Sequence, residues 1–248
     1  MNDADTHLTR RAVLGGAALA AAAAPFAAAA ASAAPPPGTN AAPASLTPDE
    51  ALERLKRGNR EFLAGRAMVP DVNGKRRLEI AKAQYPIAVL VSCSDSRVPP
   101  ELLFGRGLGE LFIVRNAGNT IDTVAMGSLE YAVAELHVPL VVVMGHERCG
   151  AVAAAVSVVE KGATFPGSIG RMVEPIVPAV LQAQRTRPRD LLDASVRENV
   201  RRTVARLRDF SEPMVMDRLK ARKLRIVGAR YDLDDGRVDF FDEGPARG

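Results

Sequence analysis

The sequence predicts an α/β fold, with a mainly parallel central sheet flanked by helices in a single domain. Three short apolar runs rich in β-branched residues, at 86–92, 110–116 and 139–145, are typical of strands buried on both faces of a parallel sheet. Helical patterns follow the second and third runs, at residues 122–137 and 149–162. Alternation of strands with helices in one chain favours such a layered sheet.

The remaining elements follow from local signals. Thr47, Pro48 and Glu50 have the pattern of a capping box with proline in the first turn, which predicts a helix through about residue 65. Two or three more helices are expected between about residues 171 and 222. Residues 224–241 are interpreted as two strands around an Asp-Asp-Gly turn.

Residues 1–33 have the features of an export signal. Arg10 and Arg11 precede an Ala-rich, weakly hydrophobic run that ends in small residues around Ala33. This pattern resembles a twin-arginine signal peptide, which implies the twin-arginine translocase as a partner and a periplasmic or secreted protein. A membrane anchor is the alternative, but Pro25 interrupts the run, so no stable membrane span is expected in the mature form.

Composition describes an ordinary globular protein after this segment. Residues 34–46 form a Pro- and Ala-rich linker, and the folded domain is expected over residues 47–248. The net charge is only +4, and 47% of the residues are apolar. The most basic stretch, 185–208, has apolar residues at helical spacing and no aromatic side chains, so we expect an amphipathic helix and no nucleic-acid partner.

Two of the predicted strands end in clusters of ionisable side chains. The first strand leads to Cys93, Asp95 and Arg97, and the third leads to His146 and Cys149. The carboxyl ends of parallel strands meet at one edge of a sheet, and the only two cysteines of the chain lie there. Two thiolates, an imidazole and a carboxylate suit tetrahedral zinc, so we expect one Zn²⁺ per chain.

Simpler interpretations of the two cysteines stay open at this point. An exported protein can form a disulfide, and buried thiols can be inert. A disulfide leaves Asp95, Arg97 and His146 unexplained. His137, which follows a predicted helix and precedes Pro139, is interpreted as a cap or surface residue.

Four motifs in succession, CSDSRVPPE, LFIVRNAGN, GSLEYA and GHERCGA, resemble those of the β-class carbonic anhydrases. The similarity extends over residues 47–241. It implies reversible hydration of carbon dioxide to bicarbonate and a proton, with zinc held by Cys93, His146 and Cys149. The fourth zinc position is then shared between water and Asp95.

The resemblance also implies a role for the Asp-Arg pair. With Asp95 bonded to Arg97, zinc keeps a water that can attack carbon dioxide as hydroxide. With Asp95 on zinc, that water is lost. We expect the open arrangement, with the two side chains bonded to each other, at neutral pH.

Further site residues are implied by position. Gln84 matches a glutamine that donates a hydrogen bond to the substrate oxygen, and the backbone amide of Gly150 assists. Phe112 and Tyr131 match apolar pocket positions at a subunit interface, which implies a homodimer or a higher homo-oligomer.

Some family members carry a second, inhibitory bicarbonate pocket built from Trp, Arg and Tyr. Arg115 and Tyr231 match the Arg and the Tyr. Leu90 stands at the Trp position and the chain contains no Trp, which leaves that pocket incomplete.

Two other functions are compatible with parts of this pattern. Related hydrolases of carbonyl sulfide or carbon disulfide keep the zinc ligands and the Asp-Arg pair, so the ligands do not separate the two activities. A non-enzymatic zinc or redox module would use both cysteines, but it would need neither Arg97 nor Gln84.

Overall fold

The computed structural model describes residues 46–66, 72–209 and 212–244, and these lie within one compact unit, Pro35–Gly248. The predicted signal peptide at 1–33 and almost all of the linker at 34–46 lie outside the described residues. In the part of the chain that is described, no helix combines the length and the apolar character needed to cross a membrane.

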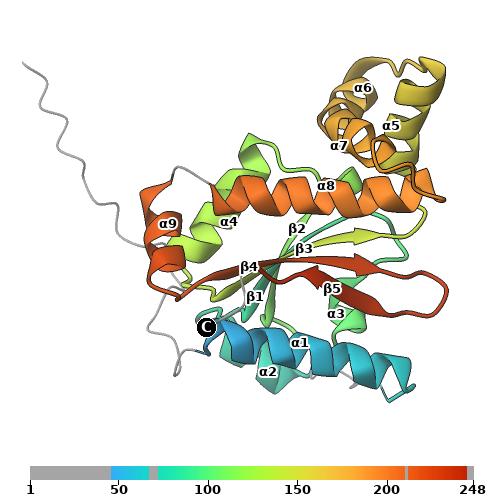
Figure 1. Ribbon diagram of the computed structural model, residues 1–248. Helices are drawn as coiled ribbons and strands as arrows, with labels where there is room; N and C mark the ends of the chain where they lie inside the picture. The colour runs from blue at the N-terminus through green and yellow to red at the C-terminus, as the bar shows by residue number, and fades with distance from the viewer. Residues whose placement is uncertain (1–45, 67–71, 210–211, 245–248) are drawn as a thin grey trace, which may run out of the picture. The chain divides into compact units, whose positions relative to one another are not determined.

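A five-stranded sheet with the order β2-β1-β3-β4-β5 forms the centre of this unit (Figure 1). The strands are β1 (Ala88–Ser92), β2 (Leu111–Arg115), β3 (Leu140–His146), β4 (Arg225–Tyr231) and β5 (Val238–Asp242). β1 pairs in parallel with β2 and β3, and β3 pairs in parallel with β4. Only β5 runs antiparallel, paired with β4. The prediction of an α/β fold with a mainly parallel sheet is therefore confirmed.

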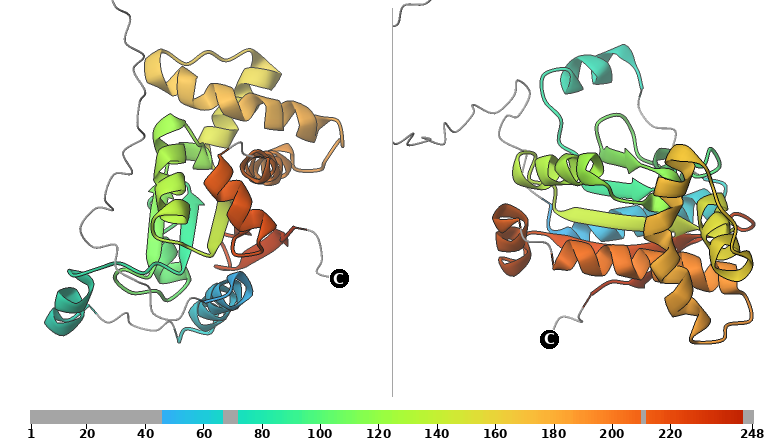
Figure 2. Two further views of the ribbon diagram at one scale, coloured as in Figure 1. Left: turned by 90° about the vertical axis from the view of Figure 1, so that its left-hand side faces the viewer. Right: turned by 90° about the horizontal axis from the view of Figure 1, so that it is seen from above.

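Helices flank the sheet on both faces (Figures 1 and 2). The α-helices are α1 (Pro48–Leu63), α2 (Gly74–Ile80), α3 (Pro100–Leu103), α4 (Thr123–Ala134), α5 (Gly150–Lys161), α6 (Gly167–Val173), α7 (Val177–Gln184), α8 (Leu191–Arg208) and α9 (Pro213–Lys220). Two 3-10 turns, η1 (Ala117–Asn119) and η2 (Glu174–Ile176), complete the set. The capping box is present, because Thr47 accepts from the Glu50 amide and the Glu50 carboxylate accepts from the Thr47 amide.

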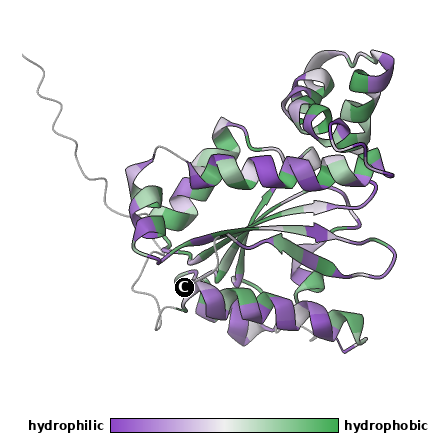
Figure 3. Ribbon diagram, viewed as in Figure 1, coloured by the Kyte–Doolittle hydropathy of each residue, from purple (hydrophilic) through white to green (hydrophobic). Residues whose placement is uncertain are grey.

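The side chains of the strands alternate between two apolar layers. Leu90 of β1 packs in the layer that contains Leu55 of α1, whereas Val91 packs in the layer that contains Leu129 of α4 and Val204 of α8. Each such side chain contributes about 1.5–3 kcal/mol when fully buried. The apolar strands and the more polar outer helix faces are visible in Figure 3.

β2 differs from the expectation that it is buried on both faces. It is an edge strand, and of its five residues only Val114 is buried. An edge strand lacks a second neighbour, and sequence pattern alone does not reveal which strand lies at the edge.

The chain order reverses on either side of β1, because β2 lies on one side of it and β3 on the other. In open α/β sheets, ligands bind at such a reversal, beyond the carboxyl ends of the strands. A third apolar cluster, formed largely by α5 to α8, covers this point and includes Cys93 and Cys149. The fold thus encloses both cysteines at the position where a site is expected.

Gly58 of α1 tests the close packing of this helix. A Cβ added there would lie 1.9 Å from the Phe104 carbonyl oxygen, a backbone atom that cannot move aside. We expect Gly58→Ala to lower the free energy of unfolding by about 1–3 kcal/mol, measured by urea denaturation. Gly127 of α4 is the control, because a Cβ there meets nothing within 4 Å. Gly127→Ala should be neutral or stabilise by up to about 1 kcal/mol. Equal stabilities of the two variants would contradict the packing argument.

Candidate active site

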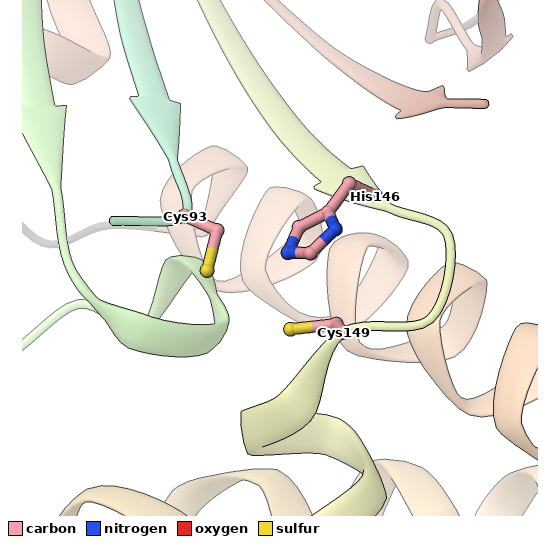
Figure 4. Close-up of side chains that lie close together, drawn as sticks. All are labelled: Cys93, His146 and Cys149. Carbon is pink, nitrogen blue, oxygen red and sulfur yellow. The ribbon is translucent and has the colours of Figure 1, made fainter. Parts of the chain in front are cut away.

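Three buried side chains, Cys93, His146 and Cys149, converge beyond the carboxyl ends of β1 and β3 (Figure 4). Their ligand atoms all lie within 4.8 Å of one another. Cys93 follows β1, His146 ends β3, and Cys149 is the N-cap of α5. The turn between the last two is closed by Arg148, whose φ of 51° lies in the left-handed region. The three predicted metal ligands are thus brought together.

His146 is fixed in the tautomer that a metal site requires. Its Nδ1 lies 2.9 Å from the Glu147 carbonyl oxygen, which can only accept, so Nδ1 carries the proton. Its Nε2 is buried and has no hydrogen-bond partner in the described part of the chain. A buried nitrogen lone pair without a partner costs free energy unless a cation occupies it. The imidazole therefore offers a free ligand atom on the side of the two sulfurs.

The two thiols differ in their protonation. The pKa of Cys93 is lowered mainly because the Cys149 thiol donates to its sulfur, and the Gly118 amide also donates to this sulfur, at 3.3 Å. The same contact and burial raise the pKa of Cys149. The pair therefore shares one proton, and a bound cation would favour release of that proton.

The donor set fits a soft or borderline divalent cation. Two sulfurs and one imidazole nitrogen make up a set of three protein ligands, the number and the kind that hold zinc in catalytic sites. Both cysteines are free thiols, so the disulfide interpretation is wrong for this structure. Burial of all three ligands excludes competing solvent from their outer sides.

Asp95 lies next to this centre and is held by Arg97. Arg97 Nε donates to Asp95 Oδ1 at 3.0 Å and its Nη2 donates to Oδ2 at 2.8 Å, a bidentate pair. The Arg97 backbone amide also donates to Oδ1, at 3.0 Å. Asp95 Oδ2 is 3.8 Å from His146 Nε2, so the carboxylate reaches the ligand side of the imidazole. This is the arrangement expected of an open site.

Arg97 keeps the pKa of Asp95 far below its ordinary value, mainly through the side-chain hydrogen bonds and then through its backbone amide. A carboxyl with a lowered pKa contributes stability above its unfolded pKa of about 3.9 and loses that contribution as the pH falls toward the folded value. Exposure of 54% for the Arg97 side chain weakens the contribution by solvent screening. Asp95 thus remains ionised at every pH near neutrality.

The other predicted site residues have separate positions. Gly150 begins α5 directly after Cys149, and the first amide of a helix has no intrahelical partner. Phe112 of β2 and Tyr131 of α4 contact each other with ring centroids 6.3 Å apart. Gln84 is exposed in the segment before β1, at the opposite end of that strand from Cys93. The structure therefore does not bring Gln84 to the ligands of its own chain.

The loop between His146, at the end of β3, and Cys149, at the start of α5, is anchored to the β4–β5 turn. Arg148 donates to both carboxylate oxygens of Asp234, at 2.9 and 2.6 Å, and Glu147 accepts from the Leu233 amide at 3.1 Å. Asp234, through its hydrogen bonds, raises the pKa of Arg148 further. Glu147, Asp232 and Asp234 are close together, but arginine side chains pair with each of them. This acidic group is therefore a structural ion-pair network.

Sequence reasoning did not predict that Arg115, matched there to the bicarbonate pocket, and Asn199 support the ligands. Arg115, the last residue of β2, donates from Nε to the Cys93 carbonyl at 2.8 Å and from Nη2 to the Asp95 carbonyl at 2.6 Å. Asn199 of α8 donates to the Gly118 carbonyl at 2.9 Å, behind the amide that faces Cys93. The Arg115 contacts follow from the parallel pairing of β2 with β1, which places Arg115 opposite Ser92, next to Cys93. For Asn199, 81 residues from Gly118, no local signal existed.

Comparison with known proteins agrees with this geometry. A family profile described as "Carbonic anhydrase" matches residues 88–238. The chain is 43% identical over 196 residues to "Carbonic anhydrase 2" of Mycobacterium tuberculosis, which covers 79% of this chain and 93% of that relative.

Solved structures agree as well. The β-carbonic anhydrase CafA of Aspergillus fumigatus is 27% identical, with a TM-score of 0.62 over 80% of this chain and 92% of the other. A β-carbonic anhydrase of Sordaria macrospora, 24% identical, shares the fold with a TM-score of 0.64 over 77% of this chain and 96% of the other.

Cys149→Ser tests the coupling of the metal to the fold. We expect loss of bound metal, measured by elemental analysis, because a serine hydroxyl is a poor replacement for a thiolate. Where free metal exceeds its dissociation constant about 1,000-fold, the loss costs about 4 kcal/mol of unfolding free energy. Removing the metal from the native chain with a chelator should lower its urea midpoint to that of the variant. A variant that retains one metal per chain would contradict the assignment of Cys149 as a ligand.

Proposed function

Since this chain belongs to the β-class carbonic anhydrases, we propose that its reversible hydration of carbon dioxide uses one Zn²⁺ per chain, held by Cys93, His146 and Cys149. The chain is a carbonate dehydratase, and its products are bicarbonate and a proton. The single observation that supports the metal site is the convergence of two free thiols and the unpaired imidazole nitrogen within 4.8 Å.

Zinc in such a site lowers the pKa of a coordinated water toward 7 and so supplies a nucleophile at neutral pH. The protein side chains decide whether that chemistry is available. Asp95, held away from the ligand atoms by Arg97, would leave room for a water on the bound metal. It would accept a hydrogen bond from that water and so orient it toward the carbon of the substrate. We name this pair the Asp95–Arg97 gate.

The substrate lies against the residues that the resemblance implies. The Gly150 amide, free of an intrahelical partner, faces a developing negative charge at the N-terminus of α5, where the helix dipole favours an anion. Phe112 and Tyr131 supply apolar surface for carbon dioxide, which carries no net charge. Gln84 donates a hydrogen bond to a substrate oxygen.

The enzyme is a homodimer or a higher homo-oligomer. β2 is an edge strand with the partly exposed apolar residues Leu111, Phe112 and Ile113, and such an edge favours coverage by another chain. Gln84 supports the same assembly. The strand β1 separates Gln84 from Cys93, and its five residues span about 16 Å at 3.3 Å per residue. Gln84 therefore reaches a metal site only in a second copy of the chain. Light scattering that gives the mass of one chain would contradict this assembly.

Asp95→Asn tests the gate. The amide keeps the size of the side chain but loses the charge that Arg97 binds and one acceptor, so turnover should fall about 10- to 100-fold or more while the metal is retained. Stopped-flow hydration rates and elemental analysis measure the two effects. Asp239→Asn is a matched control, because Asp239 also accepts from an arginine, Arg197, but lies on β5. Asp95→Asn with full metal and native rates would show that the gate has no role.

The mature enzyme is periplasmic or secreted after twin-arginine export and cleavage near Ala33. The Arg-Arg sequence at 10–11 and the Ala-rich run after it support this proposal.

Replacement of Arg10 and Arg11 by lysine tests the export route. The charge is kept and only the arginine signature is lost, so we expect uncleaved precursor to accumulate in the cytoplasm, measured by cell fractionation and N-terminal sequencing. Arg201 and Arg202, an exposed Arg-Arg pair on α8, provide the matched control when both are replaced by lysine. Unchanged export of the Arg10 and Arg11 variant would exclude this route.

A further inference from the structure

We infer that Arg115 is a positioning residue that holds the main chain on both sides of Ser94 and thereby sets the direction in which the Asp95 carboxylate points. The inference deepens the proposed function, because it rests on the Asp95–Arg97 gate. It assigns to Arg115 a role in turnover without contact to substrate or metal.

The geometry ties the Cys93–Asp95 segment to the end of β2. One guanidinium donates to two carbonyls two residues apart, Cys93 at 2.8 Å and Asp95 at 2.6 Å. In the opposite direction, Ser94 Oγ donates to the Arg115 carbonyl at 3.1 Å. Hydrogen bonds from a charged donor are stronger than neutral ones, and a planar fork fixes direction as well as distance. The segment that carries both a ligand and the gate is thus held to the sheet by three side-chain bonds.

Arg115 differs from the two other arginines near the ligands. Arg97 and Arg148 each pair with a carboxylate, Asp95 and Asp234 respectively. Arg115 is half-buried, and no carboxylate of the described residues lies within ion-pair distance of it. Its hydrogen bonds go to main-chain carbonyls of the ligand loop. Such a guanidinium fixes backbone geometry and does not neutralise a neighbouring acid.

The gate needs this external support. All three bonds from Arg97 to Asp95 join residues two positions apart, and the Arg97 side chain is 54% exposed, so the pair can move as one body. The Asp95 carbonyl is held from outside the loop by Arg115, with the Val98 amide bonded to the same oxygen at 3.0 Å. Asp95 Oδ2 is only 3.8 Å from His146 Nε2, so a small rotation of the Asp95 backbone would bring the carboxylate within reach of a metal held by that nitrogen.

The same contacts bear on the incomplete bicarbonate pocket. Leu90, at the position of the missing Trp, is fully buried in the layer next to α1, and Tyr231 is buried in that layer too. The guanidinium of Arg115 is engaged by the ligand loop. Arg115 therefore serves the main site in this chain.

Arg115→Met and Arg115→Lys in the zinc-loaded full chain test the inference. We expect the methionine variant to keep one metal per chain and to lose about 10- to 100-fold in kcat, the range for residues that support metal ligands, with a smaller effect on KM. Lysine, a point charge that reaches one carbonyl, should restore part of the loss. The visible absorption of the cobalt-substituted methionine variant should shift, because the carboxylate approaches the ligand position.

Arg218→Met is the matched control. Arg218 also donates to main-chain carbonyls, of His137 at 2.8 Å and Lys223 at 3.4 Å, but these lie before β3 and β4, at the other end of the sheet. It should keep native kcat and the native cobalt spectrum. If Arg218→Met lowers the free energy of unfolding as much as Arg115→Met but leaves turnover unchanged, the loss of turnover in Arg115→Met comes from positioning and not from general packing.

A double-mutant cycle with Asp95→Asn decides whether Arg115 acts through Asp95. If it does, Arg115→Met should cost less than about threefold in the Asp95→Asn background. Three results would each overturn the inference: an equal fold-loss in both backgrounds, native kcat in Arg115→Met, or loss of the metal from that variant. Native rates in Asp95→Asn alone would instead refute the gate itself, so the two failures are distinguishable.

Discussion

The placement of β1 between β2 and β3 is the constraint on which the site depends. Parallel pairing puts the carboxyl ends of all three strands at one edge of the sheet, and the reversal of chain order at β1 opens a gap there. Cys93 leaves β1 and His146 ends β3, so the pairing alone brings a thiol and an imidazole together. Cys149 follows because α5 must start at the same edge to cross back over the sheet.

Burial of three polar ligands costs desolvation free energy, and hydrogen bonds with neighbouring groups offset part of this cost. His146 Nδ1 bonds the Glu147 carbonyl, and the Gly118 amide supports the Cys93 sulfur. Asn199 of α8 holds Gly118 in turn. Nε2 of the imidazole lacks a partner among the described residues, and of the few buried side-chain atoms in that state it alone belongs to one of the three ligands. It is the atom that a cation needs. The pattern of satisfied and unsatisfied atoms is therefore itself a sign of metal binding.

Much of the fold and the metal ligands could be predicted from sequence because their signals are local. The runs that form β1 and β3, the capping box at Thr47 and the clusters after each strand each lie within a few residues. α2 could not be predicted, because it has seven residues and none of them is buried, so no apolar period marks it. α3 is a single turn of four residues that begins at Pro100, too short for a helical period.

The features that sequence reasoning left out or could not locate depend on spatial neighbours. The edge position of β2 follows from strand order, which a single sequence does not encode locally. Gln84 could be matched by its spacing from Cys93, but its distance from that residue depends on β1 being extended between them. Arg115 lies 22 residues after Cys93, and its contact exists only through the register of β1 with β2. Strand pairing brings residues of this kind next to the ligands, so they are identified from the structure and not from the sequence.

The electrostatics of the gate determine how it can switch. Arg97 lowers the pKa of Asp95, so the carboxylate stays ionised from neutral pH down to below its ordinary value of about 3.9. Protonation of Asp95 therefore cannot open or close the site near neutrality. Only a movement that exchanges Arg97 for another cation can do so. A metal held by His146 Nε2 would be such a cation, because this nitrogen lies 3.8 Å from Asp95 Oδ2. With a metal bound, the Asp95 carboxylate would be attracted by two cations, and backbone shifts far smaller than a strand spacing would decide between them. The anchoring of the Asp95 main chain to β2 therefore matters as much as the contact with Arg97.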